Sequence, residues 1–328
     1  MREKTKKVDR RIWRPGRMIL VLVLLLLFLW SAGSIQARAA IVTEDITPPE
    51  PVGSDLKIVH EVTKLASPRW IQSFTMDSKY YYFIQMTRPK DGHLRITRVK
   101  YKGFGKYTKD HMDLKYFGHA TNLDCSVYKG VTYLWTGSNA RSGSDVSRAI
   151  SCFKYKKNGV LYHHAPIYYR IPKGAWGKYV TNVYPAVNKG GTRLAVRFTY
   201  NKKQYYQIYA LNQGTKINVH RPIKQVILSA TKGDFQGFDL YGTTIYTIEG
   251  SPRAAFLRGY DASRVYQPTV IRTADYKTGQ KTKQVIHGAK ALSFREPEGI
   301  KVISGRKVII MYVSNLLTDQ SCNIYQVK

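Results

Sequence analysis

The stretch YFGHATNLDCSVYKGVTYLWTGS, residues 116–138, holds two apolar-rich segments on either side of the turn Tyr128-Lys129-Gly130. Aromatic and β-branched residues alternate there with polar ones, which is typical of strands that bury one face. Glycine in the turn can adopt the positive φ that a tight hairpin requires. The stretch therefore predicts a β-hairpin, and the question is whether the chain repeats it.

Five segments share this pattern of a polar start, an apolar anchor, a turn and an apolar-rich strand. They are residues 71–86, 120–138, 183–198, 235–250 and 297–313, with the anchors Phe74, Leu123, Ala186, Phe238 and Ile300. A third strand is expected after each hairpin, at 94–101, 147–155, 205–211, 270–276 and 322–328. A fourth strand is expected in four units, at 113–118, 160–169, 216–228 and 283–288.

The fifth unit has no fourth strand of its own, because the sequence ends at Lys328. An unmatched strand pattern, LKIVHEVTKL, lies instead at residues 56–65. Five four-stranded units predict an all-β, five-bladed β-propeller over residues 56–328. Pairing of the N- and C-terminal strands in one blade would close the ring and cover both edges. A β-sandwich, or two smaller β domains, is the competing fold.

The N-terminal segment has the pattern of a secretory signal peptide over residues 1–39. A basic region is followed by the apolar run 19–30 and by Ala37-Arg38-Ala39, where we expect cleavage. The protein is therefore expected to be secreted, and to contact a membrane only through this segment. The alternative is an uncleaved segment that anchors the protein in the membrane. Residues 40–55 are acidic and proline-rich, and they predict an extended lead-in.

The chain carries 53 Lys and Arg against 21 Asp and Glu. For an exported protein this charge favours an anionic cell-wall polymer, such as teichoic acid, as the partner. Nucleic acid fits the charge but not the compartment, so no nucleic-acid partner is expected. Residues 101–110, 153–159 and 197–206 interleave aromatic residues with lysine. Such stretches are either polymer-binding surfaces or ordinary strands whose lysines are solvated.

Three cysteines, Cys125, Cys152 and Cys322, are too few for a disulfide framework. We interpret them as small core residues and leave open a bridge between Cys125 and Cys152. No C-x-x-C or H-x-x-x-H spacing is present, so neither a metal site nor a cofactor is expected. No feature of the sequence indicates an oligomeric state.

Polar residues that differ between the units occur where the inner strands begin. If they converge at one mouth of a central channel, they could bind a sugar or a phosphate group. They are Gln72, His119, Asn122, Tyr184, Gln236 and Glu298. The alternative is that they bond to backbone at a crowded entrance. Because no second acid occupies the position of Glu298 in another unit, no catalytic residue is assigned and no enzyme is expected.

Residues 117–138 and 235–250, with the order of the units, give the chain a resemblance to known families. It resembles the helveticin J family of large secreted bacteriocins and, more distantly, the propeller shared by teichoic-acid biosynthesis protein C and certain phage receptor-binding proteins. The resemblance covers residues 56–328, but Ala120 stands where the family pattern has glycine.

The resemblance implies a secreted, bacteriocin-like protein that binds anionic cell-wall glycopolymers of Gram-positive bacteria. One alternative is a secreted glycan-active hydrolase or lyase that uses the channel mouth around Glu298 and His119. The other is a cell-surface or phage-derived adhesin that does not kill.

Overall fold

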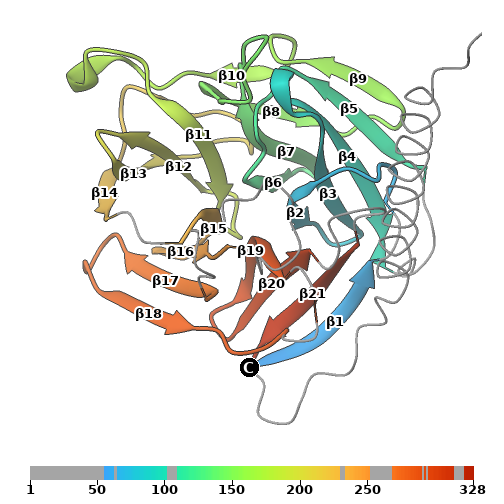
Figure 1. Cartoon of the computed structure of the whole chain (residues 1–328). Helices are drawn as coiled ribbons and strands as arrows, with labels where there is room; N and C mark the ends of the chain where they lie inside the picture. The colour runs from blue at the N-terminus through green and yellow to red at the C-terminus, as the bar shows by residue number, and fades with distance from the viewer. Residues whose placement is uncertain are drawn as a thin grey trace, which may run out of the picture. The chain divides into compact units, whose positions relative to one another are not determined.

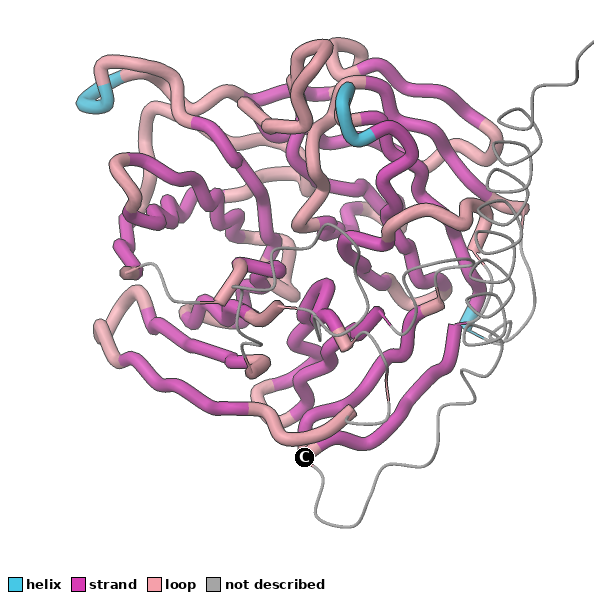
Figure 2. Tube along the Cα trace, in the orientation of Figure 1, coloured by secondary structure: helices cyan, strands magenta, loops and turns pink. Residues whose placement is uncertain are grey.

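The computed structural model describes residues 55–62, 65–101, 109–229, 233–251, 268–289, 292, 295–313 and 321–328. Strands and loops make up nearly all of the described part (Figure 2). The strands form five sheets arranged around one axis (Figure 1), which confirms the predicted all-β, five-bladed propeller. The predicted signal peptide, 1–39, lies outside the described residues, as does the lead-in before Asp55. No helix in the described part is long and apolar enough to cross a membrane.

Each blade is numbered in chain order, and its strands are given from the axis outward. Blade 1 holds β2 (Ile71–Met76), β3 (Tyr80–Arg88), β4 (His93–Lys100) and β5 (His111–Lys115). Blade 2 holds β6 (Leu123–Tyr128), β7 (Val131–Ser138), β8 (Ala149–Lys154) and β10 (Ile167–Tyr169). Blade 3 holds β11 (Thr181–Val187), β12 (Arg193–Tyr200), β13 (Lys203–Ala210) and β14 (Lys224–Leu228).

Blade 4 holds β15 (Phe235–Tyr241), β16 (Thr244–Glu249), β17 (Val270–Asp275) and β18 (Lys281–Val285). Blade 5 holds β19 (Glu296–Ser304), β20 (Lys307–Val313), β21 (Cys322–Val327) and β1 (Leu56–Val62). Two 3-10 turns, Pro89–Asp91 and Gly174–Trp176, are the named helical elements. All five predicted inner hairpins are present, and each of them is followed by a third strand, as expected.

The two ends of the propeller meet in blade 5, as predicted. Strand β1 pairs antiparallel with β21, from Leu56 opposite Val327 to Val62 opposite Cys322. The blue β1 and the red β21 lie side by side in Figure 1. Leu56 and Ile324 are fully buried. The pairing therefore covers the edge that each terminal strand would otherwise expose.

The predicted fourth strand of the second unit, 160–169, is wrong as a single element. A turn at residues 163–166 divides it. The first part, β9 (Gly159–Tyr162), pairs parallel with β5 and becomes a fifth strand of blade 1. Only β10 completes blade 2, paired with β8. Pro166 accounts for the break, because proline has no N–H to donate to a sheet.

The predicted fourth strand of the third unit, 216–228, is shorter than expected for the same reason. Pro222 precedes β14, and only Lys224–Leu228 pairs with β13. Outer strands of this kind expose lysines, as β18 does at Lys281 and Lys283. Lysines on an open edge disfavour pairing with the edge of another sheet.

Apolar side chains fill the spaces between neighbouring blades. Leu123 packs with Ile84 of blade 1, whereas Trp135 packs with Phe198 of blade 3, so one hairpin serves two interfaces. All three cysteines are free thiols, so the bridge between Cys125 and Cys152, left open from the sequence, does not form.

The register of the closing pair can be tested with an engineered disulfide. Lys57 lies directly opposite Gln326, a spacing that suits a disulfide. We expect the Lys57→Cys, Gln326→Cys variant to oxidise readily and to gain about 2–4 kcal/mol in free energy of unfolding. The measurement is urea denaturation with and without reductant.

The control places the second cysteine out of register. Glu61 pairs with Asn323, three residues from Gln326, which is about 10 Å along the strand. We expect the Glu61→Cys, Gln326→Cys variant to stay reduced. Equal oxidation of the two variants would contradict the register of the closing pair.

Candidate functional site

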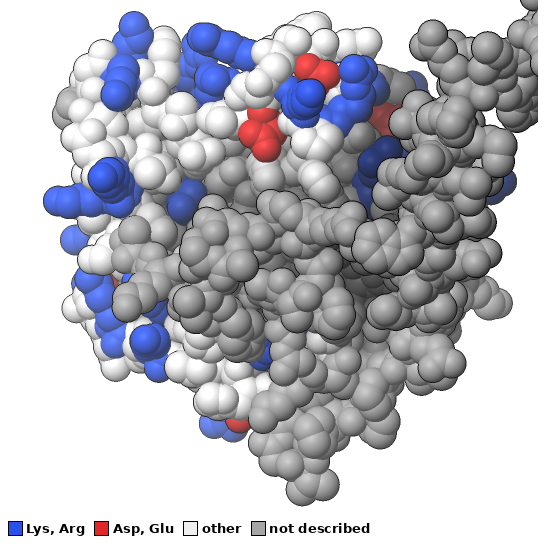
Figure 3. Space-filling view, viewed as in Figure 1, with Lys and Arg blue, Asp and Glu red and all other residues white. Residues whose placement is uncertain are grey.

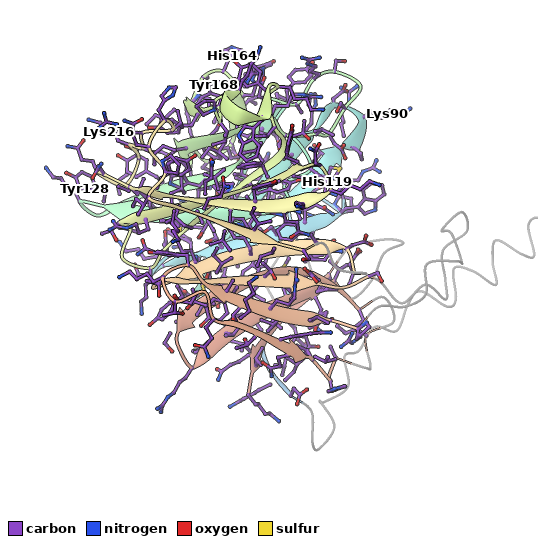
Figure 4. The ribbon with its side chains drawn as sticks, turned by 90° about the vertical axis from the view of Figure 1, so that its left-hand side faces the viewer. Lys90, His119, Tyr128, His164, Tyr168 and Lys216 are labelled. Carbon is purple, nitrogen blue, oxygen red and sulfur yellow. The ribbon has the colours of Figure 1, made fainter. Side chains whose placement is uncertain are left out.

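The five inner strands, β2, β6, β11, β15 and β19, line the axis and define its two ends. We call the end where they begin the first mouth and the end where they finish the second mouth. His119, just before β6, and Tyr128, at the end of β6, point to opposite sides of the propeller in Figure 4. The residues proposed from the sequence therefore belong to the first mouth.

Between the mouths, a buried ion triad occupies the axis. The Lys301 Nζ of blade 5 lies 2.5 Å from Asp124 Oδ1 of blade 2 and 3.1 Å from Asp239 Oδ1 of blade 4. The other oxygens accept backbone N–H groups of the next blades, Asp124 from Val187 and Asp239 from Val302, each at 2.6 Å. One cluster of three side chains thus ties four blades together.

The Lys301 ammonium keeps its charge because the two carboxylates compensate for its burial. Burial lowers the pKa of Lys301, but the two carboxylates outweigh burial and the net pKa is raised. Burial raises the pKa of Asp239 to about 7, although the Lys301 ammonium opposes that rise. An ammonium between two carboxylates satisfies most of its donors, which a buried charge requires.

Asn122 also crosses the axis and bonds only to backbone groups there. Its Nδ2 donates to the Pro185 carbonyl at 2.6 Å, and its Oδ1 accepts the Phe238 N–H at 2.9 Å. Gly237, with a φ of +139°, makes room, since a Cβ there would lie 3.3 Å from Asn122 Oδ1. For Asn122 the backbone-bonding alternative therefore holds. The axis is filled with side chains, so a ligand can meet the mouths but not an open channel.

The structure brings Gln72, Gln236 and Glu298 together at the first mouth, and all three are buried. Gln72 Nε2 is 3.5 Å from Glu298 Oε1, and Gln236 Nε2 donates to Glu296 Oε1 at 3.0 Å. Glu298 Oε2 is buried without a hydrogen-bond partner. Tyr184 lies on the same rim, buried and hydrogen-bonded to neighbouring hydroxyl groups. This group of side chains is the candidate site.

Its environment favours the neutral form of the Glu298 carboxyl group. Burial raises its pKa well above the ordinary value, and the charges of Glu296 and Asp234 add to the effect. Burial also raises the pKa of the half-buried Glu296 to about 7, against a hydrogen bond from Gln236. Glu296 was not predicted from the sequence, because only acids at matching positions of different units were considered. The Glu-Pro-Glu sequence, which places two acids in one strand, could have identified it.

His119 lies apart from this group. Its side chain is 44% exposed, and its Nδ1 is 2.7 Å from Asp145 Oδ2. This hydrogen bond lowers the pKa of Asp145. The sequence offered no partner for His119, so the pair is a structural finding. The next residue, Ala120, has a φ of +62°, so the tight turn forms even though alanine stands where the family pattern has glycine.

The second mouth opens into a cavity of about 320 Å³. Its lining includes Asp77, Cys125, Lys189 and Lys301. Their polar atoms are already partnered: the Asp77 carboxylate accepts Tyr82 and Thr132 hydroxyl groups, and Lys189 donates to a backbone carbonyl. Burial raises the pKa of the Cys125 thiol to about 12, so it is not a nucleophile. The unsatisfied polar atoms favour the first mouth as the binding end.

Two of the three lysine-aromatic stretches are ordinary strands. Phe198 and Tyr206 in 197–206, and Phe153 in 153–159, are buried in the interfaces between blades. Most of the third stretch, 101–110, lies outside the described residues. Lysine and arginine side chains gather around the periphery of the face shown in Figure 3. The exterior is thus cationic, whereas the aromatic rings in these two stretches pack inside.

Residues 70–320 match a family model described as the phage 5-bladed beta propeller receptor binding platform domain. The chain is 27% identical over 254 residues to the putative major teichoic acid biosynthesis protein C of Bacillus subtilis (strain 168), covering 72% of this chain and 53% of that protein. It also resembles the tail fiber of Staphylococcus aureus phage P68, with a TM-score of 0.60 and 16% identity, over 90% of this chain and 56% of that one.

The chain spans about half the length of each of these two relatives. The likeness to the tail fiber, at 16% identity, shows a shared fold. The expected resemblance to phage receptor-binding propellers is confirmed, and the relative named for teichoic acid biosynthesis agrees with it. The resemblance to the helveticin J family stays a prediction.

Removing the cation of the axial triad should destabilise the propeller strongly. In the Lys301→Met variant, Asp124 and Asp239 would be left buried without a counter-charge. We expect a loss of about 3–5 kcal/mol in free energy of unfolding, measured by urea denaturation. The matched control adds Asp124→Asn and Asp239→Asn, which removes all three charges and should recover more than half of the loss. A loss below about 1 kcal/mol in the single variant would mean that the triad acts like a surface pair.

Replacing Glu298 should change how stability depends on pH. The unfolded glutamate ionises near 4.5, whereas the folded one keeps its proton, so wild-type stability falls as pH rises above that value. Glutamine has no proton to lose. We therefore expect the urea midpoint of Glu298→Gln to exceed that of wild type at pH 8, and the difference between the two midpoints to shrink toward pH 5. The exposed Glu61→Gln is the control. An equal difference at both pH values would refute the raised pKa of Glu298.

Proposed function

This chain belongs to the family of phage five-bladed β-propeller receptor-binding platform domains, and from that membership we propose that it binds a bacterial cell surface. The match over residues 70–320 is the observation that carries the proposal. We propose further that the ligand is an anionic cell-wall glycopolymer of Gram-positive bacteria. The name of the Bacillus subtilis relative, which refers to teichoic acid, supports this ligand class.

The charge of the protein supports an anionic ligand. The chain has a formal net charge of +32, and lysine and arginine side chains are visible along the edge of the face shown in Figure 3. Each basic residue close to an anionic surface contributes about 1 kcal/mol, and salt screens the attraction. Long-range attraction of this kind brings the protein to the wall, and the first mouth then supplies directional hydrogen bonds.

The first mouth supports a binding role. The amide nitrogens of Gln72 and Gln236 donate within the protein, which leaves their oxygens as acceptors, and Glu298 presents a carboxyl group with an unpartnered oxygen. Such groups can bond to hydroxyl groups, which polyols and sugars carry in number.

A glycan-active hydrolase or lyase is the second candidate, and one observation favours it. Burial raises the pKa of Glu298 well above its ordinary value and that of Glu296, two residues earlier, to about 7, so the pair offers an acid and a base near neutral pH. The test is release of soluble fragments from purified walls, which Glu298→Gln would abolish. Walls that stay intact while the protein binds them favour the binding protein.

Secretion and killing belong to the same proposal. We propose export through residues 1–39 and bacteriocin-like killing of related bacteria, against the alternatives of an anchored protein and a non-killing adhesin. Mass spectrometry of the secreted chain decides cleavage after Ala39, because a retained Met1 excludes it. A zone-of-inhibition assay with the purified protein distinguishes a bacteriocin from an adhesin.

Binding to purified cell walls tests the central proposal. We expect the protein to sediment with Gram-positive walls, and to lose most of that binding when teichoic acid is extracted from them. Affinity should fall about tenfold or more between low ionic strength and ~0.5 M salt, because the attraction is electrostatic. Undiminished binding to extracted walls would show that another wall component is the ligand.

A further inference from the structure

A row of polar side chains on blade 3 faces blade 4 beside the first mouth. Tyr184 on β11, Arg197 on β12 and Tyr206 on β13 lie directly opposite one another across the sheet. Phe235 of blade 4 packs against Tyr184, with 6.3 Å between the ring centroids. Since Phe235 precedes Gln236, this row adjoins the candidate site.

Arg197 is buried in this row without a charge partner. It is 6% exposed, and its guanidinium carbon lies 3.7 Å from the centre of the Phe235 ring. Its Nε has no hydrogen-bond partner, and none of the ion pairs among the described residues includes it. Its guanidinium group also forms a hydrogen bond with the Tyr206 hydroxyl.

The acid on the facing blade is engaged through one oxygen. Glu249 Oε1 accepts a hydrogen bond from Arg272 Nη2 at 2.6 Å, Arg272 also donates to the Ser229 carbonyl, and Glu249 Oε2 is buried without a hydrogen-bond partner. Arg197, Arg272 and Glu249 all act on the pKa of the Tyr206 hydroxyl, so the three charges lie around one side chain.

A buried guanidinium without a counter-ion is costly to the folded protein. Its aromatic neighbours compensate in part, because a guanidinium stacked on a ring gains cation–π attraction. They do not neutralise it or satisfy its Nε–H donor. The unpartnered donor and the charge suit an anionic group, and a guanidinium pairs best with phosphate or carboxylate oxygens.

We infer that Arg197 is the anion-binding residue of the first mouth and that it binds one phosphodiester group of the polymer. The inference rests on the proposed function and names the part of the ligand that the site recognises. A phosphodiester carries one negative charge and offers oxygen atoms to a guanidinium group. Hydroxyl groups on either side of the phosphate would then meet Gln236 and Glu298.

The test uses the full-length protein and a defined poly(glycerol phosphate) oligomer, titrated by calorimetry at 0.15 M salt. We expect Arg197→Gln to weaken binding about tenfold to a hundredfold, the loss of a charged hydrogen-bonding group. Arg197→Lys keeps the positive charge but loses the planar arrangement of N–H donors, so its affinity for the oligomer should lie between those of wild type and Arg197→Gln. Arg193→Gln is the control, since it removes the same charge from the opposite end of β12.

The urea midpoint gives a second test. Replacing an arginine that had only a structural role would lower the midpoint, whereas replacing one that binds a ligand would not. Without polymer, Arg197→Gln should unfold at the same urea concentration as wild type or a higher one, because it removes an uncompensated charge. With polymer, only wild type and Arg193→Gln should gain stability. A lower midpoint for Arg197→Gln without polymer would overturn the inference.

The outcomes separate the inference from the proposed function. If wild type binds walls but Arg197→Gln binds the oligomer equally well, the inference fails and the proposed function stands. If wild type prefers polygalacturonate to poly(glycerol phosphate), the ligand is a carboxylate polymer and the phosphodiester is wrong. If wild type binds no wall, the proposed function fails and the inference fails with it.

Discussion

A single ammonium group shared by two carboxylates holds the centre of this propeller. Lys301 reaches Asp124 and Asp239 from a third blade, and both carboxylates also accept backbone N–H groups of the blades that follow them. The inner strands cannot slide along the axis without breaking several of these bonds at once. The positions of both mouths, and of every polar group on them, therefore depend on this buried triad.

The two mouths differ in how completely their polar groups are satisfied. At the second mouth, the cavity is lined by groups such as Asp77 and Lys189 whose bonds are made within the protein. At the first mouth, Arg197 and Glu298 keep atoms without partners despite burial. Folding alone gives no reason to keep such atoms, since an unpaired buried polar group is unfavourable. The proposed ligand would pair with these atoms when it binds at the first mouth.

The sequence predicted the blades because their pattern is local. Each inner hairpin repeats an anchor and a turn, and the unmatched strand at 56–65 pointed to closure with 322–328. The division of 160–169 between two blades was missed, since it depends on which sheet has room for β9. The triad joins residues 62 and 177 positions apart, which no repeat encodes. His119 was grouped with the other site residues by its place in the repeat, yet its neighbour is Asp145.

The closing pair of strands also constrains how the protein reaches its native state. Leu56 finds its partner, Val327, only after the rest of the propeller has been synthesised. Until then β1 has no partner strand, and the edge of β20 that β21 will cover is open to other chains. Contacts of such long sequence separation make folding slow and leave intermediates prone to aggregation. The step that closes the ring is therefore also the last one that synthesis allows.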